Sequence, residues 1–345
     1  MNFETFQKSQ IEMENRAMTS CLKDKTIQTL RGFRLLAVVL IIFTGMCVGN
    51  SFAENTSPDQ GQGFKSPQEA ITAIISATRK LDAKKALAIL GPDAEKLIFS
   101  GDKVQGQEDA NDFLQKYDEK HHLEMTSPTS ATLIIGKEKW PFPIPVVKIG
   151  GNWFFDVAAG KDEILNRKIG ENELNVIQVM LAYVEAQLEY VSKDRDGDGV
   201  HEFAQKVKSD AGKKNGLYWP VKEGEELSPL GLFIAEAASE GYDVKPVKPQ
   251  PYHGYYYKIM TRQGKKAPGG AYDYLVNGNM ILGFGLIAYP AKYGISGIMT
   301  FAVNQEGVVY EVDLGEKTAE VVNKRRKYNI GKNWQKVSDQ NLGNN

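Results

Sequence analysis

The sequence predicts an α+β protein in which N-terminal helices pack on a curved antiparallel sheet and a long helix then packs on a second antiparallel sheet. Apolar residues recur at helical spacing in residues 66–90 and again in residues 169–193. Short apolar runs broken by glycine and proline follow each helical stretch, as is typical of antiparallel strands joined by turns. We therefore expect five segments: a leader at 1–53, a flexible linker at 54–63, α+β domains at 64–168 and 169–315, and a C-terminal tail at 316–345.

Composition argues against one class of partner. The 345-residue chain has 42% hydrophobic and 25% charged residues, which is ordinary for a globular protein. Its 42 basic and 43 acidic side chains give a formal net charge of −1. A nearly neutral protein has no overall field that would attract a polyanion, so we do not expect nucleic acid as a partner.

The N-terminal segment has the layout of a secretory signal peptide. Basic residues precede an apolar stretch from Leu35 to Val48, and the small residues Ser51 and Ala53 suit cleavage after Ala53. The alternative is a retained membrane anchor, but the stretch has about 14 residues where roughly 20 are needed to span a bilayer. Met18 is an alternative start. We expect a periplasmic or secreted protein that has no membrane span after cleavage.

Both cysteines, Cys21 and Cys47, lie in this leader. The processed protein would then have no disulfide, no thiol nucleophile and no cysteine metal site. Lipidation of Cys47 is disfavoured because Met46 stands where a small residue is expected.

Residues 64–168 are expected to begin with two helices. Ser66, Pro67 and Glu69 form a helix-start signature, with a capping serine, a proline in the first turn and a glutamate three residues after the cap. A second helix is expected from Ala83 to Leu90. The runs "SATLIIG" and "GGNWFFDV" then indicate strands and a late hairpin.

The second domain is expected to start with the long helix in "GENELNVIQVMLAYVEAQLEYVSKD". Strand-like runs follow from Tyr252 onward, and the Asn277-Gly278 pair is a strong hairpin signal. Another strand pair is joined at Asn304–Gly307, and a short helix is expected after Gly315. The predicted core-facing residues of the long helix are Leu174, Ile177, Leu181, Val184, Leu188 and Val191.

Several segments in order, "DGDGVHEFAQ", "GLYWPV", "PYHGYYYKI", "APGGAYDY" and "YPAKYGISGIMTFAVN", resemble the bacterial exported family called domain of unknown function 2950. The resemblance covers nearly all of the chain from about Phe64 and implies an envelope location, with no established activity. Residues 64–168 also resemble nuclear-transport-factor-2-like folds. The second half is similar to the soluble headgroups of pilins and pseudopilins, without their apolar stem. Fold alone does not select a function.

The run "KDRDGDGVHEF" at residues 193–203 is the sharpest chemical signal in the chain. Asp194, Asp196 and Asp198 alternate ahead of Gly199, which is the start of a calcium loop. Calcium takes six to eight hard oxygen ligands, and alternate residues of a tight loop can all face one ion. Val200 would then offer its carbonyl at the seventh position and Glu202 would act at the ninth.

The pattern departs from a full EF-hand loop at two positions. The twelfth position is Gln205 in place of the bidentate glutamate, and His201 replaces the usual apolar eighth residue. The alternative is that these aspartates and glycines only end the long helix and turn the chain. The sequence therefore leaves a calcium loop and a simple turn open.

Catalytic signals are weak. No nucleophile-elbow, zinc-protease or phosphate-loop motif occurs. His253, with Asp273, is the one pair that we name as a general-base candidate. Tyr255 and Tyr257 share one strand face and are candidates to line a sugar or peptide pocket, although burial of that face in a core is the preferred alternative.

These observations favour an exported, non-catalytic binding or assembly module of the bacterial envelope, with calcium as the candidate cofactor. One alternative is a cell-wall hydrolase that uses His253 and Asp273 in a cleft lined by Tyr255 and Tyr257. Another is a component of a secretion or pilus apparatus, with an envelope protein as partner.

Overall fold

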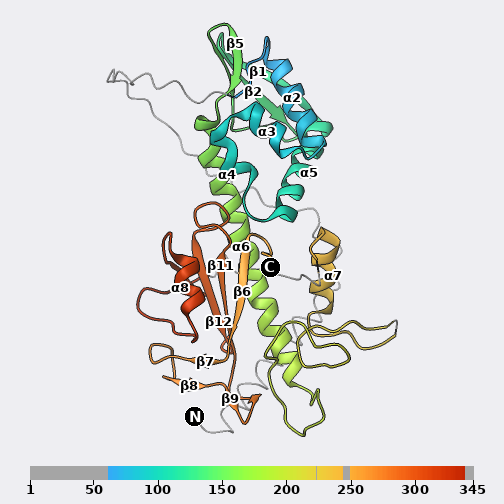
Figure 1. Cartoon of the computed structure of the whole chain (residues 1–345), viewed down its shortest axis with the longest axis vertical. Helices are drawn as coiled ribbons and strands as arrows, with labels where there is room; N and C mark the ends of the chain where they lie inside the picture. The colour runs from blue at the N-terminus through green and yellow to red at the C-terminus, as the bar shows by residue number, and fades with distance from the viewer. Residues whose placement is uncertain (1–60, 223, 244–248, 339–345) are drawn as a thin grey trace. The chain divides into compact units, whose positions relative to one another are not determined.

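The computed structural model describes residues 61–222, 224–243 and 249–338 (Figure 1). These residues form helices and antiparallel sheets, which confirms the predicted α+β class. They all belong to one compact unit. The predicted leader, its cleavage site and both cysteines lie outside the described residues.

The described chain opens with the two helices that the sequence predicts. α2 spans Pro67–Arg79 and α3 spans Ala83–Leu90. The Oγ atom of Ser66 caps α2 by accepting a hydrogen bond from the Glu69 N–H at 3.2 Å. Asp82 caps α3 through the N–H of Lys85 at 3.0 Å. Both helix starts are specified by side chains within three residues, which is why the sequence revealed them.

A helix that the sequence analysis missed follows these two. The 3₁₀ turn η2 (Pro92–Ala94) and the short α4 (Glu95–Ile98) lead into α5, which spans Lys103–Glu119. Within α5 only Gln105 is buried. A helix with so small a buried face leaves no clear apolar period, so hydrophobic spacing could not reveal it.

The first sheet is antiparallel, with the order β1-β2-β4-β5 and with β3 paired to β2. It packs against α2 through a core that includes Ile71, Ile74, Leu133, Val146 and Phe155. Its strands are β1 (His121–Ser127), β2 (Ser130–Ile135), β3 (Trp140–Pro141), β4 (Val146–Ile149) and β5 (Asn152–Phe155).

The long helix begins earlier than predicted. α6 spans Val157–Val191, so the expected domain boundary at residues 168 and 169 falls inside it. Asp156 caps its start by accepting a hydrogen bond from the Ala159 N–H at 3.2 Å. Gly160 lies against Pro143, where an added Cβ would stand 2.2 Å from the carbonyl oxygen. Such a close backbone contact has no apolar signature, so periodicity did not detect the first turns of the helix.

The predicted core face of α6 lies at the edge of the buried stripe. Ile177 and Val184 are buried, and Leu181, Leu188 and Val191 are partly buried and pack against the same core. The prediction is wrong for Leu174, which is 49% exposed. The buried stripe instead runs through Ile169, Asn172, Val176, Met180, Tyr183, Gln187 and Tyr190.

Two residues of that stripe, Asn172 and Gln187, are polar, which explains the error. The Gln187 amide accepts a hydrogen bond from the Ala204 N–H at 2.8 Å and donates to the Ala204 carbonyl at 2.8 Å. It also donates to the Tyr183 hydroxyl at 2.8 Å. A buried amide whose hydrogen bonds are satisfied is tolerated in a core, but hydropathy cannot reveal it.

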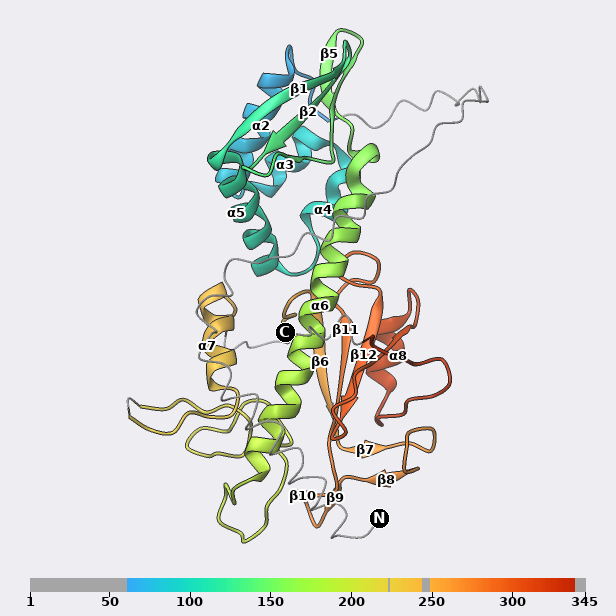
Figure 2. The ribbon, with the colours of Figure 1, turned by 180° about the vertical axis from the view of Figure 1, so that it is seen from behind.

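The second sheet lies between two helices, α6 on one face and α8 (Thr318–Lys324) on the other, as both ribbon views show (Figures 1 and 2). Alternate residues face each side: Leu286 and Phe301 pack in the core under α6, whereas Ile287 and Ala302 pack against α8. The order is β14-β13-β12-β11-β6. The strands are β6 (Tyr255–Met260), β11 (Gly285–Pro290), β12 (Met299–Asn304), β13 (Tyr310–Asp313) and β14 (Gln335–Lys336).

Two small hairpins and one helix complete the described chain. β9 (Leu275–Val276) pairs with β10 (Asn279–Met280) through Asn277 and Gly278, whose φ values of 52° and 95° confirm the predicted tight turn. β7 (Arg262–Gln263) pairs with β8 (Tyr272–Asp273), and α7 spans Gly231–Glu240. The helix expected after Gly315 is α8. Across the described ranges, every helix is too short or too polar to cross a membrane.

Candidate metal centre

The aspartate-rich loop begins where α6 ends. Ser192 is the C-cap residue, and its Oγ donates to the Glu189 carbonyl at 2.6 Å. The side chain of Arg195 is 5% exposed, donates to the Tyr190 carbonyl at 3.3 Å and lies over the ring of Trp219 at 5.5 Å. A buried guanidinium at a helix C-terminus satisfies free carbonyls and complements the helix dipole. These contacts hold the first residues of the loop against the end of α6.

Asp194 organises the backbone of the loop. One of its carboxylate oxygens accepts the Gly197 N–H at 2.8 Å and the other accepts the Gly199 N–H at 3.0 Å. These two hydrogen bonds stabilise the charged form and lower the pKa of the Asp194 carboxyl. Gly197 and Gly199 have φ values of 80° and 83°, the left-handed conformation that glycine adopts without strain.

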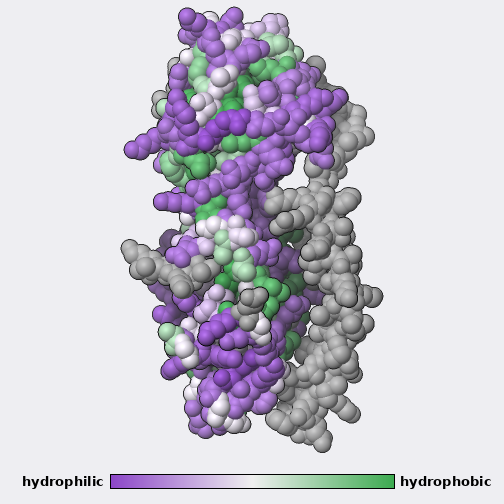
Figure 3. Space-filling model, turned by 90° about the vertical axis from the view of Figure 1, so that its right-hand side faces the viewer, coloured by the Kyte–Doolittle hydropathy of each residue, from purple (hydrophilic) through white to green (hydrophobic). Residues whose placement is uncertain are grey.

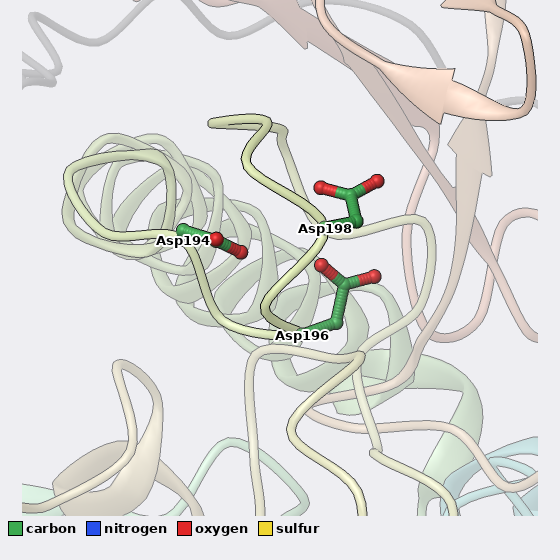
Figure 4. A group of neighbouring side chains, drawn as sticks. All are labelled: Asp194, Asp196 and Asp198. Atoms are coloured by element: carbon green, nitrogen blue, oxygen red, sulfur yellow. The ribbon is translucent and has the colours of Figure 1, made fainter.

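Asp194, Asp196 and Asp198 come together at the surface. One oxygen from each of the three exposed carboxylates lies within 4.8 Å of the others. The Asp194 carboxylate is directed across the turn toward the other two (Figure 4). Three hard oxygens on alternate residues of one turn, with a left-handed glycine at the sixth position, match the first half of a calcium loop.

The other half of the loop is held by the β9–β10 hairpin. Asp198 accepts a hydrogen bond from the Asn279 side-chain amide at 2.8 Å, and Glu202 accepts the Met280 N–H at 3.1 Å. Val200, the predicted carbonyl ligand, is half-buried and donates its N–H to Asp198 at 2.8 Å. Asn279 could not be connected with this loop from the sequence, because it lies 81 residues after Asp198 and only the fold brings the two together.

The Glu202 carboxylate is partly buried and lies close to the negative charges of Asp196 and Asp198. Burial, and then the negative charges of Asp196 and Asp198, raise the pKa of its carboxyl. A divalent cation among these carboxylates would relieve that repulsion. Glu202 also stands at the ninth loop position, which contacts calcium in EF-hands often through a water molecule.

The two departures from an EF-hand have structural consequences. The Gln205 side chain donates to the Gly278 carbonyl at 2.6 Å, so the twelfth residue contacts the hairpin. His201 makes a 2.9 Å contact from Nδ1 to the Val191 carbonyl at the end of α6. The oxygens that the loop brings together come from the three aspartates, a partial set of hard ligands that fits Ca²⁺ better than softer metals, and Glu202 is not part of that group.

The structure separates His253 from Asp273. His253 directly precedes β6, and its ring lies 3.3 Å from the Gln105 side-chain oxygen through Nδ1 and 3.8 Å from Glu240 through Nε2. Asp273 is on β8, paired with Arg262 beyond the other end of β6. A six-residue strand lies between them, about 20 Å of extended chain. The two side chains do not form one general-base site.

Tyr255 and Tyr257 share a face of β6, as predicted, but have different surroundings. Tyr255 is fully buried, and its hydroxyl donates to the Met299 carbonyl at 3.0 Å. Tyr257 lines a cavity of about 480 Å³ together with Phe233 and Tyr252. Tyr256 points to the other face, where its ring lies 5.7 Å from that of Tyr289. Of the two candidate pocket residues, Tyr257 lies at a cavity wall and Tyr255 lies in the core.

The fold and the loop define an α+β protein with one carboxylate cluster of metal-binding type in its described part. A family model described as "Protein of unknown function (DUF2950)" matches residues 61–337, so the chain belongs to that family. This confirms the family resemblance noted from the sequence. No curated protein and no solved structure matched the chain.

Proposed function

We propose that the protein is an exported, non-catalytic module of the bacterial envelope whose loop at residues 194–202 binds calcium and thereby stabilises the end of α6. The observation that carries the proposal is the meeting of Asp194, Asp196 and Asp198 within 4.8 Å, on alternate residues ahead of a left-handed glycine. The loop joins α6 to the β9–β10 hairpin through Asp198 and Glu202. Calcium bound there would strengthen a contact between distant parts of the chain.

Two parts of the proposal, export and a non-catalytic role, are supported by the sequence. The leader pattern that ends at Ala53 supports export, and oxygen-ligand sites of moderate affinity suit the high calcium concentrations outside the cytoplasm. A non-catalytic role is supported by the absence of a recognised catalytic motif in the sequence. The separation of His253 from Asp273 removes the support that this pair gave to the hydrolase alternative.

The proposal is tested by thermal unfolding of the protein in EDTA and in millimolar calcium. The gene is expressed from its first codon and the processed protein is purified, so that intact mass also tests for a chain beginning at Glu54. Calcium should raise the midpoint, because a ligand specific to the folded state adds about 2.7 kcal/mol at one hundred times its dissociation constant. Magnesium should do less, since it requires a stricter octahedral site.

Two double variants complete the test. Asp196→Asn with Asp198→Asn should abolish the calcium response. Asp93→Asn with Asp162→Asn removes the same charge from exposed positions outside the loop and should leave the response intact. If the unaltered protein shows no calcium response, the loop only ends α6 and turns the chain. A purified protein that retains the residues before Glu54 would count against processing of the leader.

A further inference from the structure

A cavity in the first part of the described chain lies far from the aspartate loop. Residues of α2, α3, α4 and α5 line this open cavity of about 690 Å³, within the size range of small-molecule sites. Its inner wall is apolar and includes Ile74, Leu90, Leu97, Phe113 and Phe142. On the face that carries α2 and α5, hydrophobic side chains reach the surface between hydrophilic ones (Figure 3).

Small residues keep this cavity open. Gly106 and Ala110 lie one turn apart on the side of α5 that lines it, and Ala77 and Ala86 line it from α2 and α3. Glycine is usually required where φ is positive or where a Cβ would clash, and neither condition holds at Gly106. Its φ is not in the left-handed region, and a Cβ added there would meet no atom within 4 Å. A larger side chain at this position would project into the empty space.

The mouth of the cavity combines apolar and cationic groups. Leu81 and Phe99 line it and are 49% and 40% exposed, which is unusual for large apolar side chains. Lys103 and Lys292 also line it. The aliphatic part of the Lys292 side chain lies against Gly101. Its ammonium group donates one of its three N–H bonds to the Phe99 carbonyl at 2.6 Å.

The carboxylates that line the same cavity are already engaged. Asp82 caps α3, and Asp109 is ion-paired with Lys168. Asp102 accepts hydrogen bonds from the Gly254 N–H at 3.0 Å and the Tyr242 hydroxyl at 3.1 Å. Among the described residues, neither Lys103 nor Lys292 has an ion pair within 4.0 Å. The cavity therefore offers an apolar interior and, at its mouth, two lysines that have no ion pair among the described residues.

We infer that this cavity binds an amphipathic anion, an unbranched acyl chain with a carboxylate or phosphate headgroup. The chain lies along the wall formed by α2, α3 and Phe113, where burial of apolar surface drives binding. The headgroup lies at Lys103 and Lys292. This site is independent of the calcium loop, which is on the far end of α6, and the failure of either proposal leaves the other standing.

The test uses a dansyl-labelled undecanoate, whose fluorescence rises in an apolar site, followed by displacement with hexadecanoate. The unaltered protein should bind the probe saturably and release it to hexadecanoate. Gly106→Phe fills the cavity and should weaken binding by about tenfold or more. Gly170→Phe is the matched control: Gly170 is an exposed glycine of α6 whose added Cβ also meets no atom within 4 Å, and its substitution should leave binding unchanged.

Headgroup recognition is tested separately. Lys103→Gln with Lys292→Gln should weaken hexadecanoate by about three- to tenfold and leave hexadecanol unaffected, because only the acid carries a charge. Lys148→Gln, at an exposed lysine on β4, is the control. A lysophosphatidylglycerol competitor distinguishes a phospholipid ligand from a free fatty acid. Stronger displacement of the dansyl probe by the lysophospholipid identifies a lipid, and stronger displacement by hexadecanoate identifies a free acid. Absence of saturable binding, or equal binding by a folded Gly106→Phe protein, would overturn the inference.

Discussion

The Asp102 carboxylate accepts a hydrogen bond from the Tyr242 hydroxyl at 3.1 Å, although 140 residues separate them. The same oxygen accepts the Gly254 N–H at 3.0 Å, while the other caps α5 through the Gln105 N–H at 3.2 Å. Burial, and then the charge of Asp102, raise the pKa of Tyr242, so its hydroxyl remains a donor. One buried carboxylate thus joins the start of α5 to the segment that leads into β6.

Replacing Asp102 should cost more than the loss of a helix cap. Asp102→Ala removes the cap and leaves the Tyr242 hydroxyl and the Gly254 N–H without their acceptor, so we expect a loss of about 3 kcal/mol in the free energy of unfolding. Asp82→Ala is the control, because Asp82 only caps α3 and should cost about 1 kcal/mol. Urea unfolding measures both. Equal losses would mean that the contacts of Asp102 with Tyr242 and Gly254 contribute nothing to stability.

Two glycines of α6 should respond to the same substitution with opposite signs. Gly160→Ala places a Cβ 2.2 Å from the Pro143 carbonyl oxygen and should destabilise the protein by about 2 kcal/mol through overpacking. Gly170→Ala meets no atom within 4 Å and should stabilise it by about 1 kcal/mol, the difference in helix propensity. Urea midpoints of the two variants give the comparison. A stabilising Gly160→Ala would disprove the close contact of α6 with Pro143.

Gln187 should be required although it is a polar residue in a core. Gln187→Leu leaves the N–H and the carbonyl of Ala204, a residue 2% exposed, without their partner. The expected loss is about 2–4 kcal/mol, because each buried unpaired group carries its desolvation cost. Gln178→Leu, on the exposed side of α6, should change stability by less than about 0.5 kcal/mol. Chemical denaturation of the two variants measures both changes in the free energy of unfolding. A Gln187→Leu protein as stable as the unaltered one would contradict the role assigned to Gln187.

Glu202 should contribute stability that increases as the pH falls in the absence of calcium. Burial, and then Asp196 and Asp198, raise the pKa of its carboxyl above the ordinary value of 4.5. A raised pKa in the folded state means that the contribution is fully present below the ordinary value and is lost as the pH rises through the raised value. The contribution of Glu202 is isolated by comparing the unaltered protein with Glu202→Gln. The difference in their free energies of unfolding is measured in EDTA between about pH 4 and 7.

The control for Glu202 is Glu124→Gln, an equal change of charge at an exposed position of β1. Its stability difference from the unaltered protein should not show the trend assigned to Glu202. Comparison with variants cancels the other carboxyls of the loop, including Asp194, whose lowered pKa acts in the opposite direction. If the Glu202→Gln difference were constant over the range, the repulsion assigned to the loop would be absent.

Local features of this protein were determined by the sequence itself. The start of α2 at Ser66 and Pro67, the Asn277-Gly278 turn and the aspartate loop all depend on residues within a few positions of one another. Backbone preferences and side-chain hydrogen bonds of that range act before any core forms. The pattern of Asp194, Asp196 and Asp198 therefore indicated carboxylates that the structure brings within reach of one ion.

Only the tertiary structure decided the features that depend on distant partners. It selected the buried face of α6, because Gln187 is satisfied by Ala204 and Gly160 fits against Pro143. It placed Asn279 beside Asp198 and separated His253 from Asp273 by the length of β6. It also left the cavity beside Gly106 open between helices. Hydropathy along a chain records the average affinity of each residue for a core, whereas these outcomes depend on which specific atoms meet across the fold.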